Sequence, residues 1–127
     1  MENRNVGWQV RAIRGATTVE ENTIEAIREA VTELLDELDR KNQLAPDRLI
    51  SVTFSVTRDL DAIFPAAIAR ARPGWDRVPL LDVQQMHVEG ALPRCIRFLI
   101  HASVPVDDFV AYHPYLRGAK QLRPDLP

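Results

Sequence analysis

The sequence contains a single cysteine, Cys95, and no apolar run long enough to cross a bilayer. One cysteine excludes a disulfide within the chain, and its place in an apolar stretch indicates a small core residue. The N-terminal residues MENRNVGWQ lack the apolar centre of a signal peptide. These absences lead us to expect a soluble cytoplasmic protein that makes no membrane contact.

An excess of charge of one sign is also missing. The 127 residues carry 16 basic and 18 acidic side chains, which gives a net charge of −2. No basic run is interleaved with aromatic residues, so we expect no nucleic-acid partner. A chain of this length with 46% hydrophobic residues corresponds to one domain with its own core. We therefore predict a single domain over residues 1–127, with residues 1–9 as a frayed N-terminal extension.

The patterns that usually carry cofactors or covalent chemistry are absent from the sequence. His87, His101 and His113 do not have the spacing of metal ligands, so we predict no metal site. Neither a glycine-rich phosphate loop nor the elbow of a serine nucleophile is present. We expect no cofactor, and the inventory favours a reaction that needs neither nucleophile, metal nor proton transfer.

Hydrophobic periodicity predicts an α+β domain, with a mixed sheet of about five strands packed on one long helix plus a short helix. Asn22 and Glu25 resemble a capping box, and apolar residues then recur at helical spacing over residues 23–41. An alanine-rich segment bounded by prolines predicts the short helix at 64–72. Strands are expected at 8–15, 48–57, 77–81, 94–102 and 118–122.

The stretch CIRFLIHA, residues 95–102, raises the first functional question. Both faces of this predicted strand are apolar apart from Arg97, so we expect a strand buried on both sides. An arginine stays charged at any relevant pH, and a buried charge needs a partner. That partner is either a structural carboxylate or a ligand.

Two further arginines lie at or near strand ends, Arg14 at the end of the first predicted strand and Arg123 near the C-terminus. Taken singly, each is more often a structural ion-pair former than a ligand group. Together with Arg97 they would present planar guanidinium groups on rigid elements, which suits bidentate binding of a carboxylate or phosphate. Because no phosphate loop is present, we favour a carboxylate ligand.

Five segments, in order along residues 10–126, resemble the small trimeric AroH-type chorismate mutases. They are RAIRGATTVEENT (11–23), DLDAIFPAAIAR (59–70), GWDRVPLLDVQQM (74–86), GALPRCIRFL (90–99) and YLRGAKQLRPDL (115–126). The resemblance implies a trimeric pseudo-α/β barrel with active sites between subunits. It also implies a pericyclic rearrangement of chorismate to prephenate, without cofactor or covalent intermediate, in phenylalanine and tyrosine biosynthesis.

The resemblance assigns roles to individual residues of this sequence. Arg14 and Tyr115 match residues that bind substrate carboxylates. Arg97 matches the arginine that contacts a carboxylate and the ether oxygen of the breaking bond. Phe64, Ala66 and Arg70 match a family segment that reaches the active site of the neighbouring subunit. Leu122 and Arg123 match C-terminal residues that close over the pocket.

Two positions depart from the family pattern. Gln85 stands where the family has a glutamate that faces the key arginine, and Asp82 stands where it has a cysteine. We interpret this as a negative charge moved three residues upstream, with Asp82 restoring the charge opposite Arg97 and Gln85 keeping hydrogen-bonding capacity. The alternative is that Asp82 faces solvent and the site has decayed.

Two other functions stay open from the sequence. One is an imine- or enamine-hydrolysing enzyme of the YjgF/RidA type, which has a similar fold and an arginine for a substrate carboxylate. The IRGATT and YLR…LRPDL segments argue against it. The other is a non-catalytic protein that binds chorismate or an aromatic amino acid, and the change to Gln85 is its only support.

Overall fold

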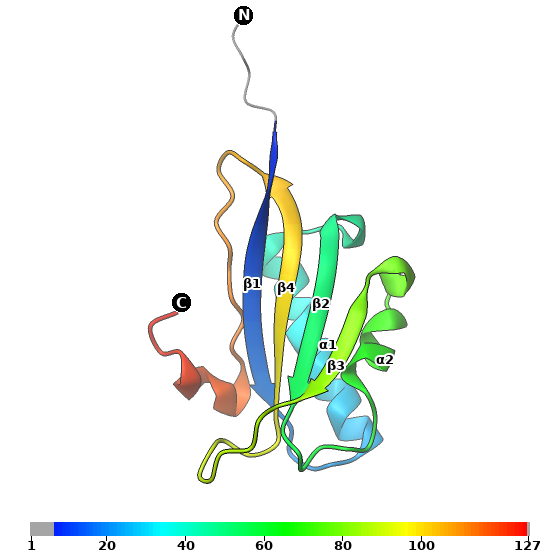
Figure 1. Cartoon of the computed structure of the whole chain (residues 1–127), viewed down its shortest axis with the longest axis vertical. Coiled ribbons are helices and arrows are strands. Elements are labelled where there is room, and N and C mark those ends of the chain that lie inside the picture. The colour runs from blue at the N-terminus through cyan, green and yellow to red at the C-terminus, as the bar shows by residue number, and fades with distance from the viewer. Residues whose placement is uncertain (1–6, 127) are drawn as a thin grey trace, which may run out of the picture.

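A computed structural model describes residues 7–126 of the chain. Its sheet has the strand order β1-β4-β2-β3 (Figure 1). β1 (Trp8–Thr18) and β2 (Leu49–Val56) flank β4 (Cys95–Pro105) in antiparallel fashion, and β3 (Leu80–Gln84) pairs in parallel with β2. The sheet is therefore mixed, as predicted, but the described residues form four strands rather than about five.

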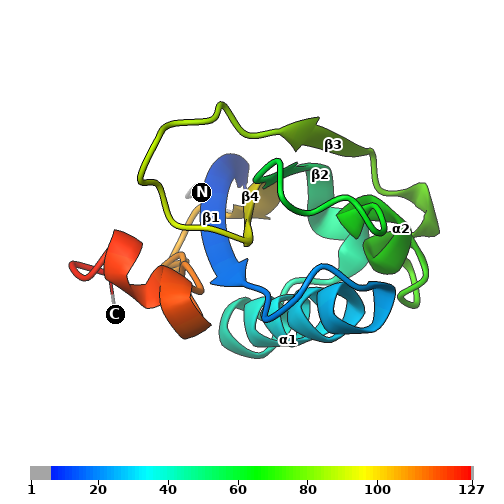
Figure 2. The same cartoon turned by 90° about the horizontal axis from the view of Figure 1, so that it is seen from below.

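The long helix α1 (Ile24–Asn42) covers one face of the sheet (Figure 2). Its N-cap is Thr23, whose hydroxyl accepts a hydrogen bond from the backbone N–H of Ala26 at 3.1 Å. Asn22, the cap expected from the sequence, instead bonds the backbone N–H and the carboxylate of Asp61. The helix was predicted correctly, and its cap lies one residue further along.

The core lies between α1 and the face of the sheet that α1 covers. The apolar residues that recur along α1 are buried, as their helical spacing predicts: Ile27, Val31, Leu34, Leu35 and Leu38. They pack in one cluster with alternate residues of three strands: Ile13, Val52, Phe54, Ile96, Phe98 and Ile100. Full burial of each such side chain contributes roughly 1.5–3 kcal/mol, so this layer dominates the stability of the fold.

No helix of residues 7–126 covers the other face of the sheet (Figure 2). Along β4, Phe98 and Ile100 point toward α1, whereas Arg97 and Leu99 point away from it. Leu99 is 45% exposed. The prediction that this strand is buried on both sides is therefore wrong for the single chain, and Arg97 lies on the open face.

Three other expectations need correction. Residues 118–122 do not form a strand, because they lie within a 3-10 helix over Arg117–Leu122. The strand expected at 77–81 begins only at Leu80, after a second 3-10 turn. Residues 8 and 9 are paired in β1 and are not frayed, while residues 1–6 lie outside the described residues. Among the described helices, none is long and apolar enough to span a membrane.

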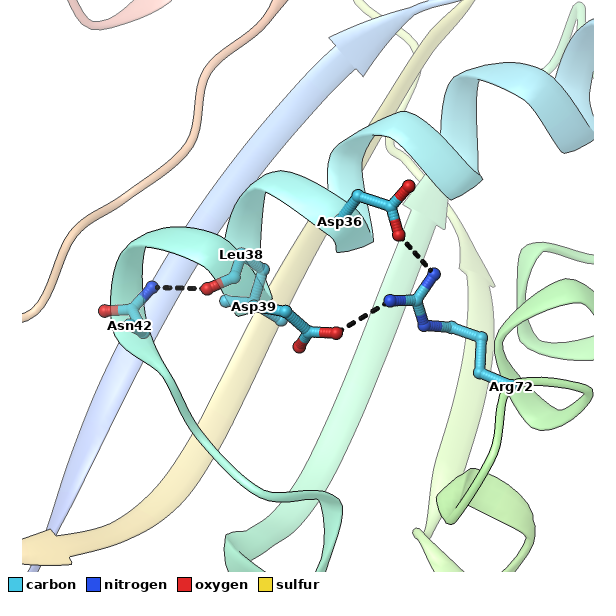
Figure 3. A network of polar contacts seen from close by, with 5 residues as sticks. All are labelled: Asp36, Leu38, Asp39, Asn42 and Arg72. Atoms are coloured by element: carbon cyan, nitrogen blue, oxygen red, sulfur yellow. Dashed lines mark hydrogen bonds and ion pairs between the residues drawn. The ribbon is translucent and has the colours of Figure 1, made fainter.

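The short helix α2 (Pro65–Arg70) lies between α1 and the edge strand β3 (Figure 2). Two residues beyond its end, the Arg72 guanidinium bonds the α1 carboxylates of Asp36 at 3.0 Å and Asp39 at 2.7 Å (Figure 3). The same guanidinium lies 5.8 Å from the ring centroid of the buried Trp75. Since the Arg72 side chain is only 17% exposed, this network, the Arg72 clip, ties α2 to α1.

Replacing Arg72 with methionine should keep the apolar part of the side chain and remove both ion pairs. We expect the free energy of unfolding to fall by about 1 kcal/mol, because partly exposed ion pairs and cation–π contacts are each worth a fraction of that. Urea unfolding of both proteins measures this difference. Arg40→Met is the matched control, since Arg40 pairs only with Glu37 of its own helix at an exposed position. Equal effects of the two substitutions would contradict a special role for the clip.

Candidate active site

A cleft of about 300 Å³ opens on the uncovered face of the sheet. Three residues that the sequence assigned to substrate binding line it together: Arg14 from β1, Arg97 from β4 and Tyr115 from the C-terminal segment. The hydroxyl residues Thr53 and Ser55 of β2 line the same cleft. The cleft thus combines two cations with hydroxyl groups, an arrangement that suits an anionic ligand.

The strand register brings the two arginines together. Leu99 is the partner of Arg14 across the β1–β4 pair, and Ala16 is the partner of Arg97. Arg14 and Arg97 are therefore diagonal neighbours on the same face of adjacent strands. Arg14 lies on the edge strand β1 and Arg97 on the inner strand β4, and the two strands are hydrogen-bonded to each other, so the spacing of the side chains is set by the backbone rather than by a loop.

Tyr115 reaches the cleft because its segment runs beside β1. The backbone N–H of Ala16 bonds the carbonyl of Pro114 at 3.0 Å, and the N–H of Leu116 bonds the carbonyl of Ala16 at 2.9 Å. This close approach requires a glycine at position 15. A Cβ on Gly15 would lie 2.5 Å from Cζ of the Phe98 ring and 2.8 Å from the Pro114 carbonyl oxygen.

Arg97 has no carboxylate partner among residues 7–126. Its Nε is buried and makes no hydrogen bond to another described group. Its partners in the flanking strands, Ala16 and Ser55, are uncharged. Of the two partners considered from the sequence, the structural carboxylate is thus not found in the single chain, which favours a ligand or a neighbouring chain.

Cys95, at the start of the same strand, is fully buried. Burial raises the pKa of its thiol, although the nearby Arg97 opposes that shift. The structure therefore supports the prediction of a core cysteine rather than a nucleophile.

His113 borders the arginine cluster and was not singled out by the sequence as a site residue. Its Nδ1 accepts a hydrogen bond from the backbone N–H of Arg14 at 3.0 Å. Burial, together with the positive charges of Arg14 and Arg123, lowers the pKa of His113. The imidazole is therefore neutral at neutral pH and fixes the edge strand without adding charge.

Leu122 ends the C-terminal 3-10 helix and Arg123 follows it, and neither residue lines the cleft. The Arg123 guanidinium forms two hydrogen bonds with the Asp125 carboxylate, Nε to Oδ1 at 3.0 Å and Nη2 to Oδ2 at 2.7 Å. This contact raises the pKa of Arg123 and lowers the pKa of Asp125. In the single chain, Arg123 is thus occupied by a carboxylate two residues away.

A second group of the assigned residues lies elsewhere, at the start of α2. Phe64 and Asp82 line an apolar groove of about 560 Å³ between α2 and β3. Phe64 is 70% exposed, and the backbone N–H of Ala66 donates to Oδ1 of Asp82 at 3.0 Å. Arg70 is exposed at the end of the same helix. None of these four residues lines the cleft that holds Arg97.

Asp82 does not face Arg97 of its own chain. In the sheet, Asp82 is paired with Phe54, whose side chain points toward α1, whereas Arg97 is paired with Ser55. Successive residues point to opposite faces of a sheet, so the two charges lie on different sides. Within one chain, the interpretation that Asp82 restores the charge opposite Arg97 is therefore wrong. The alternative of a solvent-facing Asp82 is also wrong, because its carboxylate is half-buried and bonded.

Gln85 lies just after β3, where its backbone N–H bonds the carbonyl of Val56 at 2.8 Å. It lines a third cleft, of about 260 Å³, formed by the loops that follow β2 and β3. Its side-chain Oε1 is buried and accepts no hydrogen bond from the described residues. A buried carbonyl oxygen without a donor is costly, so this atom is available to a hydroxyl or ammonium donor.

The hydroxyl groups of β2 were missed by the sequence analysis, although a signal was present. The segment SVTFSV alternates strictly between polar and apolar residues, which is typical of a strand with one buried and one open face. The apolar members of that pattern, Val52 and Phe54, are buried, while Thr53 and Ser55 line the cleft.

Comparison with known proteins gives a consistent result. The family model described as chorismate mutase type I matches residues 10–126. Chorismate mutase AroH of Thermus thermophilus is 47% identical over 118 residues, which is 92% of this chain and 96% of that protein. Chorismate mutase AroH of Bacillus subtilis is 39% identical over 117 residues, which is 92% of each chain.

The solved structure of a chorismate mutase from Clostridium thermocellum is 44% identical to the chain. It matches with a TM-score of 0.79 and covers 87% of this chain and 98% of the other. The family model, the two relatives and the solved structure agree, and the chain therefore belongs to the chorismate mutase type I family of isomerases.

Proposed function

We propose that the chain isomerises chorismate to prephenate at sites shared between the subunits of a homotrimer, as a step of phenylalanine and tyrosine biosynthesis. The observation that supports this most directly is the cleft in which Arg14 and Arg97 lie together, where Arg97 finds no carboxylate partner among residues 7–126. Chorismate carries two carboxylates, and paired guanidinium groups bind such anions well. The hydrolase and the non-catalytic binder are not favoured by the comparisons.

Within the cleft, Arg14 and Tyr115 hold the substrate's carboxylates. This restricts the substrate to the compact geometry in which the new carbon–carbon bond can form. Arg97 contacts a carboxylate and the ether oxygen of the bond that breaks. Because negative charge builds on that oxygen as the bond lengthens, Arg97 stabilises the transition state more than the ground state. No proton transfer and no covalent step is needed.

The second group of site residues is supplied by a neighbouring subunit. The exposed Phe64 of one chain, with Ala66 and Arg70 of the same segment, completes the cleft of the next chain. Large apolar side chains exposed on the open face support such a contact, among them Val10, Leu81 and Leu99. Leu122 and Arg123 close over the bound substrate.

Gln85 takes the position of a family glutamate near the ring hydroxyl of the substrate. Its buried Oε1 lacks a donor among the described residues, so it can accept a hydrogen bond from that hydroxyl. A neutral amide supplies this hydrogen bond but no charge. The balance of charge around Arg97 is then provided by the two carboxylates of the substrate.

Mixing two inactive variants tests the shared site. Arg97→Ala removes a cation from the cleft, and Phe64→Ala removes a side chain of the second group. If each site combines the cleft of one chain with α2 of another, mixed trimers contain some sites that carry neither substitution. We expect the mixture to recover chorismate-consuming activity, followed by the loss of chorismate absorbance. A monomer in sedimentation experiments that retains full activity would exclude the shared site.

Replacing Arg97 with citrulline tests its role in the transition state. Citrulline keeps the shape of the side chain and removes its charge. We expect kcat to fall by about 10²–10³, with a modest change in KM, because the lost interaction is strongest in the transition state. If KM rises while kcat stays near the parental value, Arg97 serves only to bind substrate.

A further inference from the structure

The first turn of the short helix α2 is capped by a residue that lies outside the helix. Its N-cap residue, Phe64, offers no side-chain acceptor to the free N–H groups of that turn. Oδ1 of Asp82, on the neighbouring strand β3, accepts the N–H of Ala66 at 3.0 Å instead. A helix of six residues is too short to be stable alone, so such contacts determine where it lies.

The residues around Asp82 show what this contact controls. Phe64 stands directly before the first turn, with most of its side chain exposed, and Arg70 is the last residue of the helix. Burial raises the pKa of the Asp82 carboxylate, and the hydrogen bond from Ala66 and the positive charge of Arg70 oppose that shift. The Arg72 clip holds the other end of α2, so Asp82 and Arg72 fix both ends of the segment that carries Phe64 and Arg70.

We infer that Asp82 is a positioning residue that acts on α2 of its own chain and thereby on the active site of the neighbouring chain. The inference rests on the proposed function, because only a shared site lets α2 reach a second cleft. The face on which Asp82 lies supports it, since that face is turned away from Arg97 of the same chain. What Asp82 contributes is an acceptor atom for Ala66 rather than a charge opposite Arg97 of its own chain.

Single substitutions of Asp82 distinguish a role as a hydrogen-bond acceptor from a role as a negative charge. Asp82→Asn keeps an oxygen that can accept the Ala66 N–H, and we expect it to stay near the parental kcat/KM. Asp82→Ala removes the acceptor and should lower kcat/KM by about tenfold or more, because small displacements of a contacting group are costly. Gln84→Ala, on the same strand and in the same groove, is the matched control with no expected effect. Equal losses in the Asn and Ala variants, or none in either, overturn the inference.

Mixed trimers show in which chain Asp82 acts. Asp82→Ala is added either to the Arg97→Ala chain or to the Phe64→Ala chain, and each double variant is mixed with the other single variant. The restored sites take α2 from the Arg97→Ala chain and the cleft from the Phe64→Ala chain. We therefore expect recovered activity to drop when Asp82→Ala accompanies Arg97→Ala, and to be unchanged when it accompanies Phe64→Ala.

The other outcomes of mixing are equally decisive. A drop only in the Phe64→Ala combination means that Asp82 acts on the cleft of its own chain, and equal drops in both mean general destabilisation. Either result overturns the inference while leaving the shared site intact. If the two single variants recover no activity when mixed, the shared site fails and the inference fails with it. Asp82→Ser, whose shorter side chain reaches Ala66 less well, replaces Asp82→Ala if that chain does not assemble.

Discussion

A single long helix covers one face of the sheet, and this constraint determines the place of the functional side chains that the strands carry. Because residues alternate along each strand, covering one face with α1 leaves every second residue on the other. Ile13, Phe98 and Ile100 form the core for this reason. Arg14 and Arg97, each one residue away in sequence from a core residue, are directed to the open face by the same geometry. The position of the cleft thus follows from the way in which α1 and the strands form the core.

The positive charges in and around the cleft lower the stability of the folded chain. Arg14 and Arg97 lie near each other, and Arg123 is close to Tyr115 and His113. The described part of the chain provides no carboxylate to Arg97. Like charges that are brought together and partly desolvated oppose folding. The structure limits this effect by keeping His113 neutral and by pairing Arg123 with Asp125. The remaining positive charge favours an anionic ligand in the cleft.

Sequence patterns predicted the elements with strong periodicity and failed where the outcome depends on distant contacts. The helix over 23–41 and the strand over 48–57 agree with the structure to within one or two residues. The short segment 118–122 could not be distinguished from a turn, because five residues do not define a period. The grouping of Arg14, Arg97 and Tyr115 in one cleft was expected only from the family resemblance, since it depends on a register that no local pattern encodes. The face on which Asp82 lies could not be deduced either, because it depends on that same register.

The two tryptophans of the chain lie in different environments. Trp8, at the start of β1, is half exposed and lies under the Arg48 guanidinium, 3.7 Å from its ring centroid. Trp75 is almost fully buried beside the Arg72 clip. An indole in water emits at longer wavelength than one in an apolar core, so the intrinsic fluorescence of the chain has two separable components. The shorter-wavelength emission of Trp75 reports on the position of α2, and the longer-wavelength emission of Trp8 reports on the outer edge of the sheet. Neither measurement needs an added label.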